Sequence, residues 1–332
     1  MVDSTGLPEF ADIEAAAARI APYAVETPLF ENAALNKRFG GRVFLKLESL
    51  QRTGSFKFRG AYNRIGLIPE SERAGGVVAF SSGNHAQGVA AAAALLGIPA
   101  TIVMPKDAPR AKIEGTKALG AEIVYYDRAS DDREAIATRI VKERGATLVR
   151  PFDDAGIVAG QGTIGLEIAR QAAAHNARLD AVLVPCSGGG VVSGIALALS
   201  GTSPGTLAIS VEPENFDGMR RSLAAGEQTT APGGELSVAD ALMAPTPGHV
   251  PFAIAKKLMR MGLRVNDDQL ATAVAYAAQH LKLIVEPGGS AGLAAVLGGQ
   301  YDVRGKAIAI VLTGGNCDFE TIAECVSQVS EE

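Results

Sequence analysis

The sequence predicts an α/β protein of two lobes, each built on a mostly parallel sheet flanked by helices. Three observations support this fold class. Apolar runs of strand character alternate with helical, alanine-rich segments, and this alternation is typical of parallel sheets with right-handed crossovers. The chain has 332 residues, which exceeds the roughly 250 residues at which single cores stop growing. Its 38 glycines suit a protein with many tight turns.

The expected strands are short apolar runs bounded by polar or glycine-containing segments. They cover residues 43–47, 76–80, 100–104, 122–126, 146–149, 181–184, 208–211 and 307–312. Segments of helical periodicity are expected at residues 86–96, 111–119, 133–144, 162–175, 191–199 and 267–280. No repeat of fixed period and no low-complexity linker interrupts this order. Composition therefore does not mark a boundary between the lobes.

Charge and hydropathy exclude several classes of partner. The net charge is −5, and no run of Lys and Arg is interleaved with aromatic residues, so nucleic acid is not expected as a partner. No stretch approaches 18 uninterrupted apolar residues, so no membrane-spanning segment is expected. Residues 1–10 lack the basic-then-apolar pattern of a signal peptide. The 3 cysteines form no C-x-x-C pair. Both observations favour the cytoplasm.

A glycine run lies between an expected strand and an expected helix, at Ser187-Gly188-Gly189-Gly190. Glycines at this position let backbone N–H groups close around an anion at the positive end of the helix, and phosphate is the expected guest. A tight turn without a ligand is the alternative. The run matches neither G-x-G-x-x-G nor the P-loop pattern, so the sequence does not favour dinucleotide binding or ATP hydrolysis.

Two further polar loops follow expected strands. Residues 81–85 read Ser-Ser-Gly-Asn-His and precede a helix, where hydroxyl, amide and imidazole groups suit a carboxylate ligand. Simple helix capping is the alternative. Residues 313–316 read Thr-Gly-Gly-Asn. Open α/β sheets bind ligands at the carboxyl ends of their strands, so both loops are candidates for a binding site.

Lys57 is the candidate nucleophile. It lies between two phenylalanines in the segment SFKFRG, with Arg52 and Arg59 close by in sequence. A lysine that is partly desolvated and close to other cations has a lowered pKa, so that it can attack an aldehyde as a neutral amine. Taken alone, Lys57 would more often be a solvated surface lysine.

Six motifs together resemble the serine/threonine dehydratase and serine racemase family of fold type II pyridoxal 5′-phosphate (PLP) enzymes, whose fold is like that of the tryptophan synthase β subunit. They lie at residues 55–60 (SFKFRG), 81–85 (SSGNH), 160–163 (GQGT), 187–190 (SGGG), 286–287 (EP) and 313–316 (TGGN). The resemblance implies PLP as cofactor. It also implies a large PLP-binding domain of residues 1–75 and 150–332, into which a small substrate-gripping domain of residues 76–149 is inserted.

The resemblance assigns cofactor-binding roles to individual positions. Lys57 matches the Schiff-base lysine, Asn84 the residue that bonds the ring hydroxyl, and Thr313 the hydroxyl that faces the pyridine nitrogen. The other implied cofactor-binding residues are Phe56, Ser187, Gly188, Gly189, Gly190, Val191 and Glu286.

The family's substrate site falls at the second polar loop. Ser81, Ser82, Asn84 and His85 lie where the family grips the substrate carboxylate. Ser82 also occupies the position of the second proton carrier in serine racemases, so Lys57 and Ser82 are the implied catalytic residues.

The implied reaction is α,β-elimination, which converts a β-hydroxy-α-amino acid such as L-threonine or L-serine to a 2-oxo acid and ammonia. Arg133 matches an arginine of serine racemase that can reach a second carboxylate, so 3-hydroxyaspartate, which would give oxaloacetate and ammonia, is an alternative substrate. A solvated helix arginine is an equally good interpretation of Arg133. An amino-acid racemase acting on serine or aspartate is a further alternative.

A divalent cation is an open expectation. Several family members hold one beside the PLP lobe, and here Glu212 matches the first ligand and Phe216 a backbone carbonyl ligand. Gly218 stands where the second acidic ligand is expected, which leaves Asp217 as a substitute. Mg²⁺ or Ca²⁺ suits such oxygen ligands, whereas an ordinary pair of surface acids is the alternative. The resemblance also implies a homodimer, by analogy alone.

Overall fold

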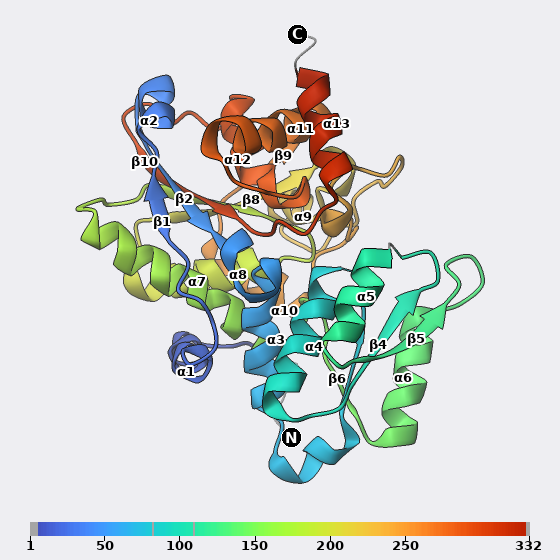
Figure 1. Ribbon diagram of the computed structural model, residues 1–332. Coiled ribbons are helices and arrows are strands. Elements are labelled where there is room, and N and C mark those ends of the chain that lie inside the picture. The colour runs from blue at the N-terminus through green and yellow to red at the C-terminus, as the bar shows by residue number, and fades with distance from the viewer. Residues whose placement is uncertain (1–5, 82, 109, 330–332) are drawn as a thin grey trace.

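Two sheets form the frame of the protein (Figure 1). The computed structural model describes residues 6–81, 83–108 and 110–329, without the side chains of residues 111 and 112. In this part of the chain the larger sheet has six strands in the order β1-β2-β10-β7-β8-β9, and the smaller has four in the order β5-β4-β3-β6. β1 runs antiparallel to β2, whereas the other pairs in both sheets are parallel.

The elements follow the chain in strand and helix alternation. The strands are β1 (Leu29–Glu31), β2 (Arg42–Leu47), β3 (Val77–Phe80), β4 (Ala100–Pro105), β5 (Glu122–Tyr126), β6 (Thr147–Leu148), β7 (Ala181–Pro185), β8 (Leu207–Pro213), β9 (Gly262–Val265) and β10 (Ala307–Leu312). The helices are α1 (Phe10–Ile20), α2 (Ala33–Phe39), α3 (Lys57–Gly66), α4 (Asn84–Leu96), α5 (Arg110–Ala118), α6 (Arg133–Arg144), α7 (Ala155–Ala174), α8 (Gly190–Thr202), α9 (Gly218–Ala225), α10 (His249–Leu258), α11 (Asp267–Tyr276), α12 (Ala291–Leu297) and α13 (Phe319–Val329).

The eight expected strands and the helices between them are confirmed, with ends that differ by a few residues. β1 and β9 were not predicted, because each is only three or four residues long and lies at an edge of the larger sheet. α7 begins at Ala155 rather than at residue 162, and the side chain of Asp154 caps it by accepting a hydrogen bond from the backbone N–H of Ile157. Glycines weaken the helical signal of this first part.

Side chains alternate between the two faces of each sheet, as strand geometry requires. On β2, Val43 and Leu45 belong to the core beneath α11 and α12, whereas Phe44 belongs to the core with residues of α7 and α8. On β3, Val77 packs with α3 and α4, whereas Val78 packs with α6. Each sheet is therefore covered on both faces, which is why its strands are apolar almost throughout.

Helix α3 packs on both lobes. It contacts α4, which follows β3 of the smaller sheet, and α7, which covers the larger sheet. We propose that the two sheets are the centres of two domains, residues 1–75 with 150–332 and residues 76–149. Because Lys57 is the first residue of α3, this arrangement puts the predicted nucleophile at the junction between them.

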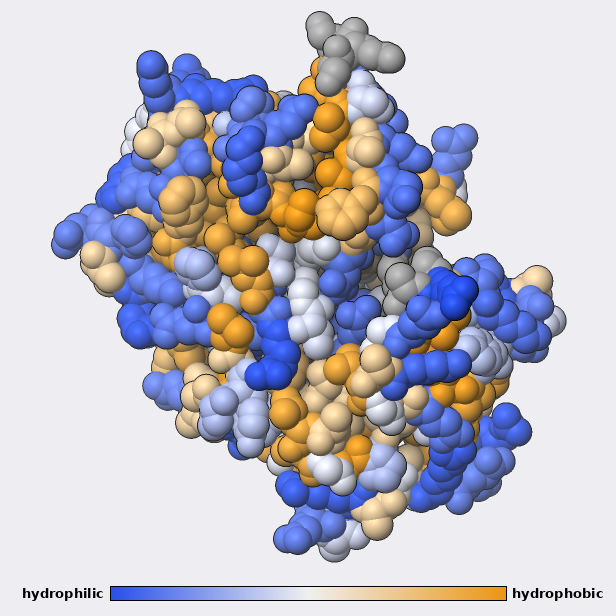
Figure 2. Space-filling model, viewed as in Figure 1, coloured by the Kyte–Doolittle hydropathy of each residue, from blue (hydrophilic) through white to orange (hydrophobic). Residues whose placement is uncertain are grey.

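The surface in view is mostly hydrophilic, with hydrophobic residues gathered along α13 near the top (Figure 2). None of the described helices is both long and apolar enough to span a bilayer.

Candidate active site

A cavity of about 240 Å³ lies where the carboxyl ends of β3, β7 and β10 meet. The loops that follow these strands supply most of its polar walls. Among the described residues, every predicted cofactor- or substrate-binding residue lines the cavity: Phe56, Lys57, Ser81, Asn84, His85, Arg133, Ser187, Gly188, Gly189, Gly190, Val191, Glu286 and Thr313. Ser82, predicted to be catalytic, lies outside the described residues. Residues separated by more than 200 positions in sequence therefore share one site.

Lys57 lies half-buried in the wall of this cavity. Its Nζ donates to the carbonyl oxygen of Pro151 at 3.0 Å. Burial lowers the pKa of Lys57 to about 8, and the negative charge of Glu286 opposes part of that shift. A substantial fraction of the amine is then neutral near physiological pH, which is the form that attacks a carbonyl.

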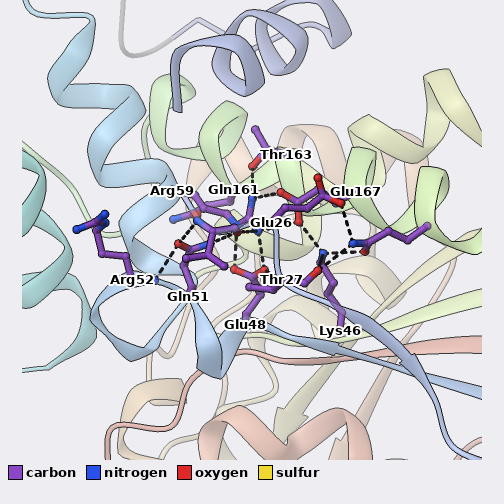
Figure 3. A network of polar contacts seen from close by, with 12 residues as sticks. Glu26, Thr27, Lys46, Glu48, Gln51, Arg52, Arg59, Gln161, Thr163 and Glu167 are labelled. Atoms are coloured by element: carbon purple, nitrogen blue, oxygen red, sulfur yellow. Dashed lines mark hydrogen bonds and ion pairs between the residues drawn. The ribbon is translucent and has the colours of Figure 1, made fainter. Parts of the chain in front are cut away.

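The opposite side of α3 is held by a buried ion cluster of Lys46, Glu48, Arg59 and Glu167 (Figure 3). Arg59 donates to both oxygens of Glu48, at 2.8 Å each, and to both oxygens of Glu167, at 2.6 and 2.9 Å. Lys46 donates to Glu167 at 2.6 Å and to two further oxygens. Two cations thus face two carboxylates, and the cluster is neutral. It anchors α3 two residues beyond Lys57.

The glycine run between β7 and α8 forms a cradle at the positive end of a 13-residue helix. Gly189 has φ of +92°, a conformation that favours glycine. A Cβ on Gly188 would lie 2.3 Å from the ring of Phe152. The hydroxyl of Ser187 accepts from the backbone N–H of Ala244 at 3.1 Å, which leaves its own hydrogen for an anion. Backbone close to the cavity and a helix N-terminus together fit a phosphate.

Asn84 begins α4, and its Nδ2 donates to Oε1 of Glu286 at 2.6 Å. Thr313 follows β10, is only 4% exposed and lines the same cavity. Its carbonyl accepts from the backbone N–H of Phe56 at 3.0 Å, so the loop after β10 is paired with the segment before Lys57. An amide, a carboxylate and a hydroxyl together offer both donors and acceptors, which suits a polar aromatic ring bonded at its edge.

His85 is neutral in this site. Burial lowers its pKa to about 3, helped by the nearby charge of Lys57. Its Nε2 lies 2.9 Å from the carbonyl oxygen of Val149, which fixes the hydrogen on Nε2 and leaves Nδ1 as an acceptor without a partner. The ring therefore offers no positive charge to a carboxylate. The N-terminal N–H groups of α4, where Asn84 and His85 lie, are the donors available for that purpose.

Arg133 lies at the mouth of the cavity, at the start of α6, with its guanidinium 5.5 Å from the centre of the Phe80 ring. It also lines an adjoining cavity of about 540 Å³, together with Arg128 and Arg150. The side chain is exposed and so can be reached by an incoming anion.

The residues expected to hold a divalent cation do not line this cavity. The carboxyl of Glu212 accepts from the backbone N–H groups of Met219 and Arg220, at 2.8 Å each. Asp217 is paired with Arg220 and Arg221, at 2.5 Å each. No group of three or more His, Cys, Asp or Glu side chains in the described chain is arranged to hold a metal ion. The donors around Glu212, Phe216 and Asp217 therefore do not fit Mg²⁺ or Ca²⁺.

Some cavity residues carried no predicted role. Pro151 and Phe152 come from the loop after β6 and had no signal in the sequence, whereas Gln161 belongs to the motif GQGT without an assigned role. Gln161 accepts from the backbone N–H of Gly60 at 3.1 Å, so it links α7 to α3.

Comparison with known proteins agrees with this geometry. The family model described as pyridoxal-phosphate dependent enzyme matches residues 20–314. An L-threo-3-hydroxyaspartate ammonia-lyase of a Pseudomonas species is 42% identical over 321 residues, which covers 96% of this chain and 98% of the relative. An L-threonine ammonia-lyase of Thermotoga maritima is 42% identical and covers 91% of this chain and 74% of the relative.

A solved structure of maize serine racemase superposes with a TM-score of 0.90 at 35% identity, covering 98% of this chain and 99% of the maize chain. This likeness confirms the predicted fold class, a fold type II arrangement of two lobes with mostly parallel sheets. The matching family model and the similar relatives each span nearly the whole chain. The chain therefore belongs to the family of pyridoxal-phosphate dependent enzymes.

Proposed function

We propose that this protein is an ammonia-lyase that removes water and then ammonia from a β-hydroxy-α-amino acid such as L-threonine or L-serine. The observation that carries the proposal is the position of Lys57. Its amine has a pKa of about 8 and lies in a cavity that also contains a glycine cradle at the N-terminus of a helix. The names of the two ammonia-lyase relatives support this reaction class.

The cofactor, when bound, supplies an electron-withdrawing ring that acidifies the Cα–H of an amino acid joined to it. Ser187, Gly188, Gly189, Gly190 and Val191 would hold its phosphate at the start of α8. Phe56, Asn84, Glu286 and Thr313 would hold its ring, and Lys57 would hold its aldehyde carbon by condensing with it and releasing one water. Thr313 would offer a neutral hydroxyl to the ring nitrogen. A carboxylate at this position would keep that nitrogen protonated, and the ring would then draw more negative charge away from Cα. A neutral hydroxyl leaves that charge to expel the β-substituent, which favours elimination over transamination.

The chain's own groups account for the proton transfers. The free amine of Lys57 takes the proton from Cα of the substrate, and the ammonium so formed gives a proton to the β-hydroxyl, which leaves as water. Release and hydrolysis of the resulting enamine consumes one water and gives the 2-oxo acid and ammonia. Ser81, Asn84 and His85 would orient the substrate carboxylate through the N-terminus of α4. No step is assigned to a divalent cation.

L-threo-3-hydroxyaspartate is the second candidate substrate, and Arg133 favours it. This guanidinium lies at the cavity mouth, where it can pair with a second carboxylate that threonine and serine lack. The name of the Pseudomonas relative also supports this substrate.

The experiment is to supply purified holoenzyme with L-threonine, L-serine and both diastereomers of 3-hydroxyaspartate and to measure the 2-oxo acid formed. Formation of 2-oxobutanoate or pyruvate supports the leading proposal, whereas oxaloacetate alone supports the second. Loss of chirality at Cα without 2-oxo acid would instead identify a racemase, with Ser82 as the residue to substitute. In Arg133→Met, kcat/KM for hydroxyaspartate should fall about tenfold or more while that for threonine changes little.

We also propose a cytoplasmic location and a homodimer. The location is supported by the three free cysteines, and the dimer by family analogy alone. Light scattering on the purified protein tests the dimer.

A further inference from the structure

We propose that Asn316 is a positioning residue, which fixes the end of the Asn84 side-chain amide that faces the cofactor cavity. Asn316 lies three residues after Thr313 and is not among the residues that line the cavity. It therefore acts through Asn84. The inference rests on the proposed function, because the bound cofactor is the group that Asn84 would contact.

The contacts form a short chain of hydrogen bonds across three loops. Nδ2 of Asn316 donates to the carbonyl oxygen of Thr53 at 2.7 Å and to Oδ1 of Asn84 at 2.8 Å. Nδ2 of Asn84 in turn donates to Oε1 of Glu286 at 2.6 Å. Thr53 precedes the nucleophile's helix, Asn84 begins α4, and Asn316 follows β10.

The groups at the two ends of this series of hydrogen bonds determine which side chain donates and which accepts in each bond. A backbone carbonyl and an ionised carboxylate accept hydrogen bonds but cannot donate them. Thr53 at one end and Glu286 at the other therefore both require an N–H. One N–H of Asn316 bonds the carbonyl of Thr53, and the other points at Asn84. Asn84 must accept that bond on Oδ1, so its Nδ2 faces Glu286. The second hydrogen on Nδ2 then remains for a ligand in the cavity that Asn84 lines.

The backbone around this chain leaves little room for another arrangement. Thr53 adopts φ of +63° without being glycine, and its carbonyl is the one held by Asn316. A Cβ on Gly54 would lie 2.3 Å from Oδ1 of Asn316, and one on Gly314 would lie 2.3 Å from Oε1 of Glu286. Both glycines are required by the close approach of the polar side chains.

The consequence is that Asn84 presents a donor to the cavity. A negatively charged ring oxygen on the cofactor is stabilised by such an N–H. If the amide turned over, Oδ1 would face that oxygen, and two acceptors would repel each other. The direction set by Asn316 therefore favours the ionised form of the ring oxygen.

The test is the absorbance of the holoenzyme of Asn316→Asp, a substitution that keeps the shape of the side chain and removes both donors. An ionised ring oxygen in the lysine-bound cofactor favours the visible band, whereas a neutral hydroxyl favours the near-ultraviolet band. We expect the ratio of visible to near-ultraviolet absorbance to fall roughly fivefold in Asn316→Asp, the effect of about one hydrogen bond. Asp318→Asn, an exposed Asp/Asn exchange in the same loop, is the matched control and should keep the wild-type ratio.

Asn316→Ala separates positioning from stability. It removes the same bonds and also the packing, but it adds no competing acceptor, so Glu286 still orients Asn84 and the ratio should fall only about twofold. A purely structural role would instead lower the thermal midpoint more in Asn316→Ala than in Asn316→Asp and leave the ratio unchanged in both.

The outcomes are distinct. A wild-type protein with no visible band after incubation with PLP overturns the proposed function itself. A normal wild-type band with an unchanged ratio in Asn316→Asp overturns only the positioning role. Should Asn316→Asp fail to fold, an unchanged ratio in Asn316→Ala overturns that role on its own.

Discussion

The two sides of helix α3 carry contrasting polar regions. On one side, the buried ion cluster of Lys46, Glu48, Arg59 and Glu167 satisfies its charged groups with protein partners alone. On the other side, the cavity holds Lys57 with a lowered pKa and His85 with an unpartnered Nδ1. A buried polar atom without a partner is costly, so the unpartnered Nδ1 of His85 fits a site that is completed by a ligand. The cluster has a structural role and the cavity a chemical one.

Removing the nucleophile should give the largest effect on activity and little effect on stability. In Lys57→Ala, the amine that binds the cofactor aldehyde and moves the Cα proton is absent, so we expect kcat/KM to fall by at least about a thousandfold. Lys142→Ala, at an exposed position of α6, is the control and should retain full activity. Comparable losses in the two variants would remove Lys57 from the mechanism.

Breaking the ion cluster should mainly lower stability rather than activity. Arg59→Met leaves the buried carboxylate of Glu48 and the half-buried carboxylate of Glu167 with Lys46 as their only cation in the cluster. We expect the free energy of unfolding to fall by about 3–5 kcal/mol in urea titrations. The matched control is Arg42→Met, which breaks the Glu31 pair at a position where Arg42 is 39% exposed. That change should cost about 1 kcal/mol or less. Equal losses in the two variants would show that burial does not distinguish the cluster from a surface ion pair.

A substitution in the glycine cradle should weaken the binding of the cofactor. In Gly188→Ala the new methyl group would meet the ring of Phe152 at 2.3 Å, so the glycine loop or that ring must shift, and both line the cofactor cavity. We expect the Kd for PLP to rise about tenfold or more, measured by absorbance titration. Gly115→Ala meets only ordinary contact, with the nearest atom of Gln87 at 3.7 Å, and should bind PLP as the wild type does. A normal Kd in Gly188→Ala would place the phosphate elsewhere.

The pH dependence of cofactor binding should give the smallest effect. The neutral amine of Lys57 is the reactive form, so the rate at which apoenzyme combines with PLP should rise with pH and level off above the lysine pKa of about 8. At pH 7 the rate should be about one tenth of the plateau, since one pH unit below a pKa leaves about a tenth of the amine neutral. Stopped-flow absorbance gives this profile. A midpoint near that of an ordinary exposed lysine would contradict desolvation of Lys57.

The sequence predicts the cavity better than the ion cluster. Lys57, Asn84 and Thr313 lie in short glycine-containing motifs after strands, and parallel sheets bring such loops to one edge. Lys46 and Glu48, by contrast, are single charged residues in or beside β2, and sequence alone does not distinguish them from solvated charges. Glu167, which pairs with Lys46 and Arg59, is more than 100 positions away from both, and only the packing of α7 brings it close.

The expected cation site likewise depends on contacts that the sequence alone does not show. Glu212 matches a ligand position of the family, yet the backbone N–H groups of Met219 and Arg220 occupy its oxygens. A Cβ on Gly218 would lie 2.6 Å from the carbonyl oxygen of Pro245. An acidic side chain would therefore not fit there without a shift. These contacts depend on how the loop before α9 folds, which a position-by-position match does not describe.

The bond between the amine at position 57 and PLP is the claim on which the function depends, and borohydride reduction followed by peptide mass spectrometry tests it most directly. A Schiff base at Lys57 predicts that one peptide, the one containing Lys57, carries the mass of the reduced cofactor. A label on another lysine, or an unlabelled protein after incubation with excess PLP, would contradict it.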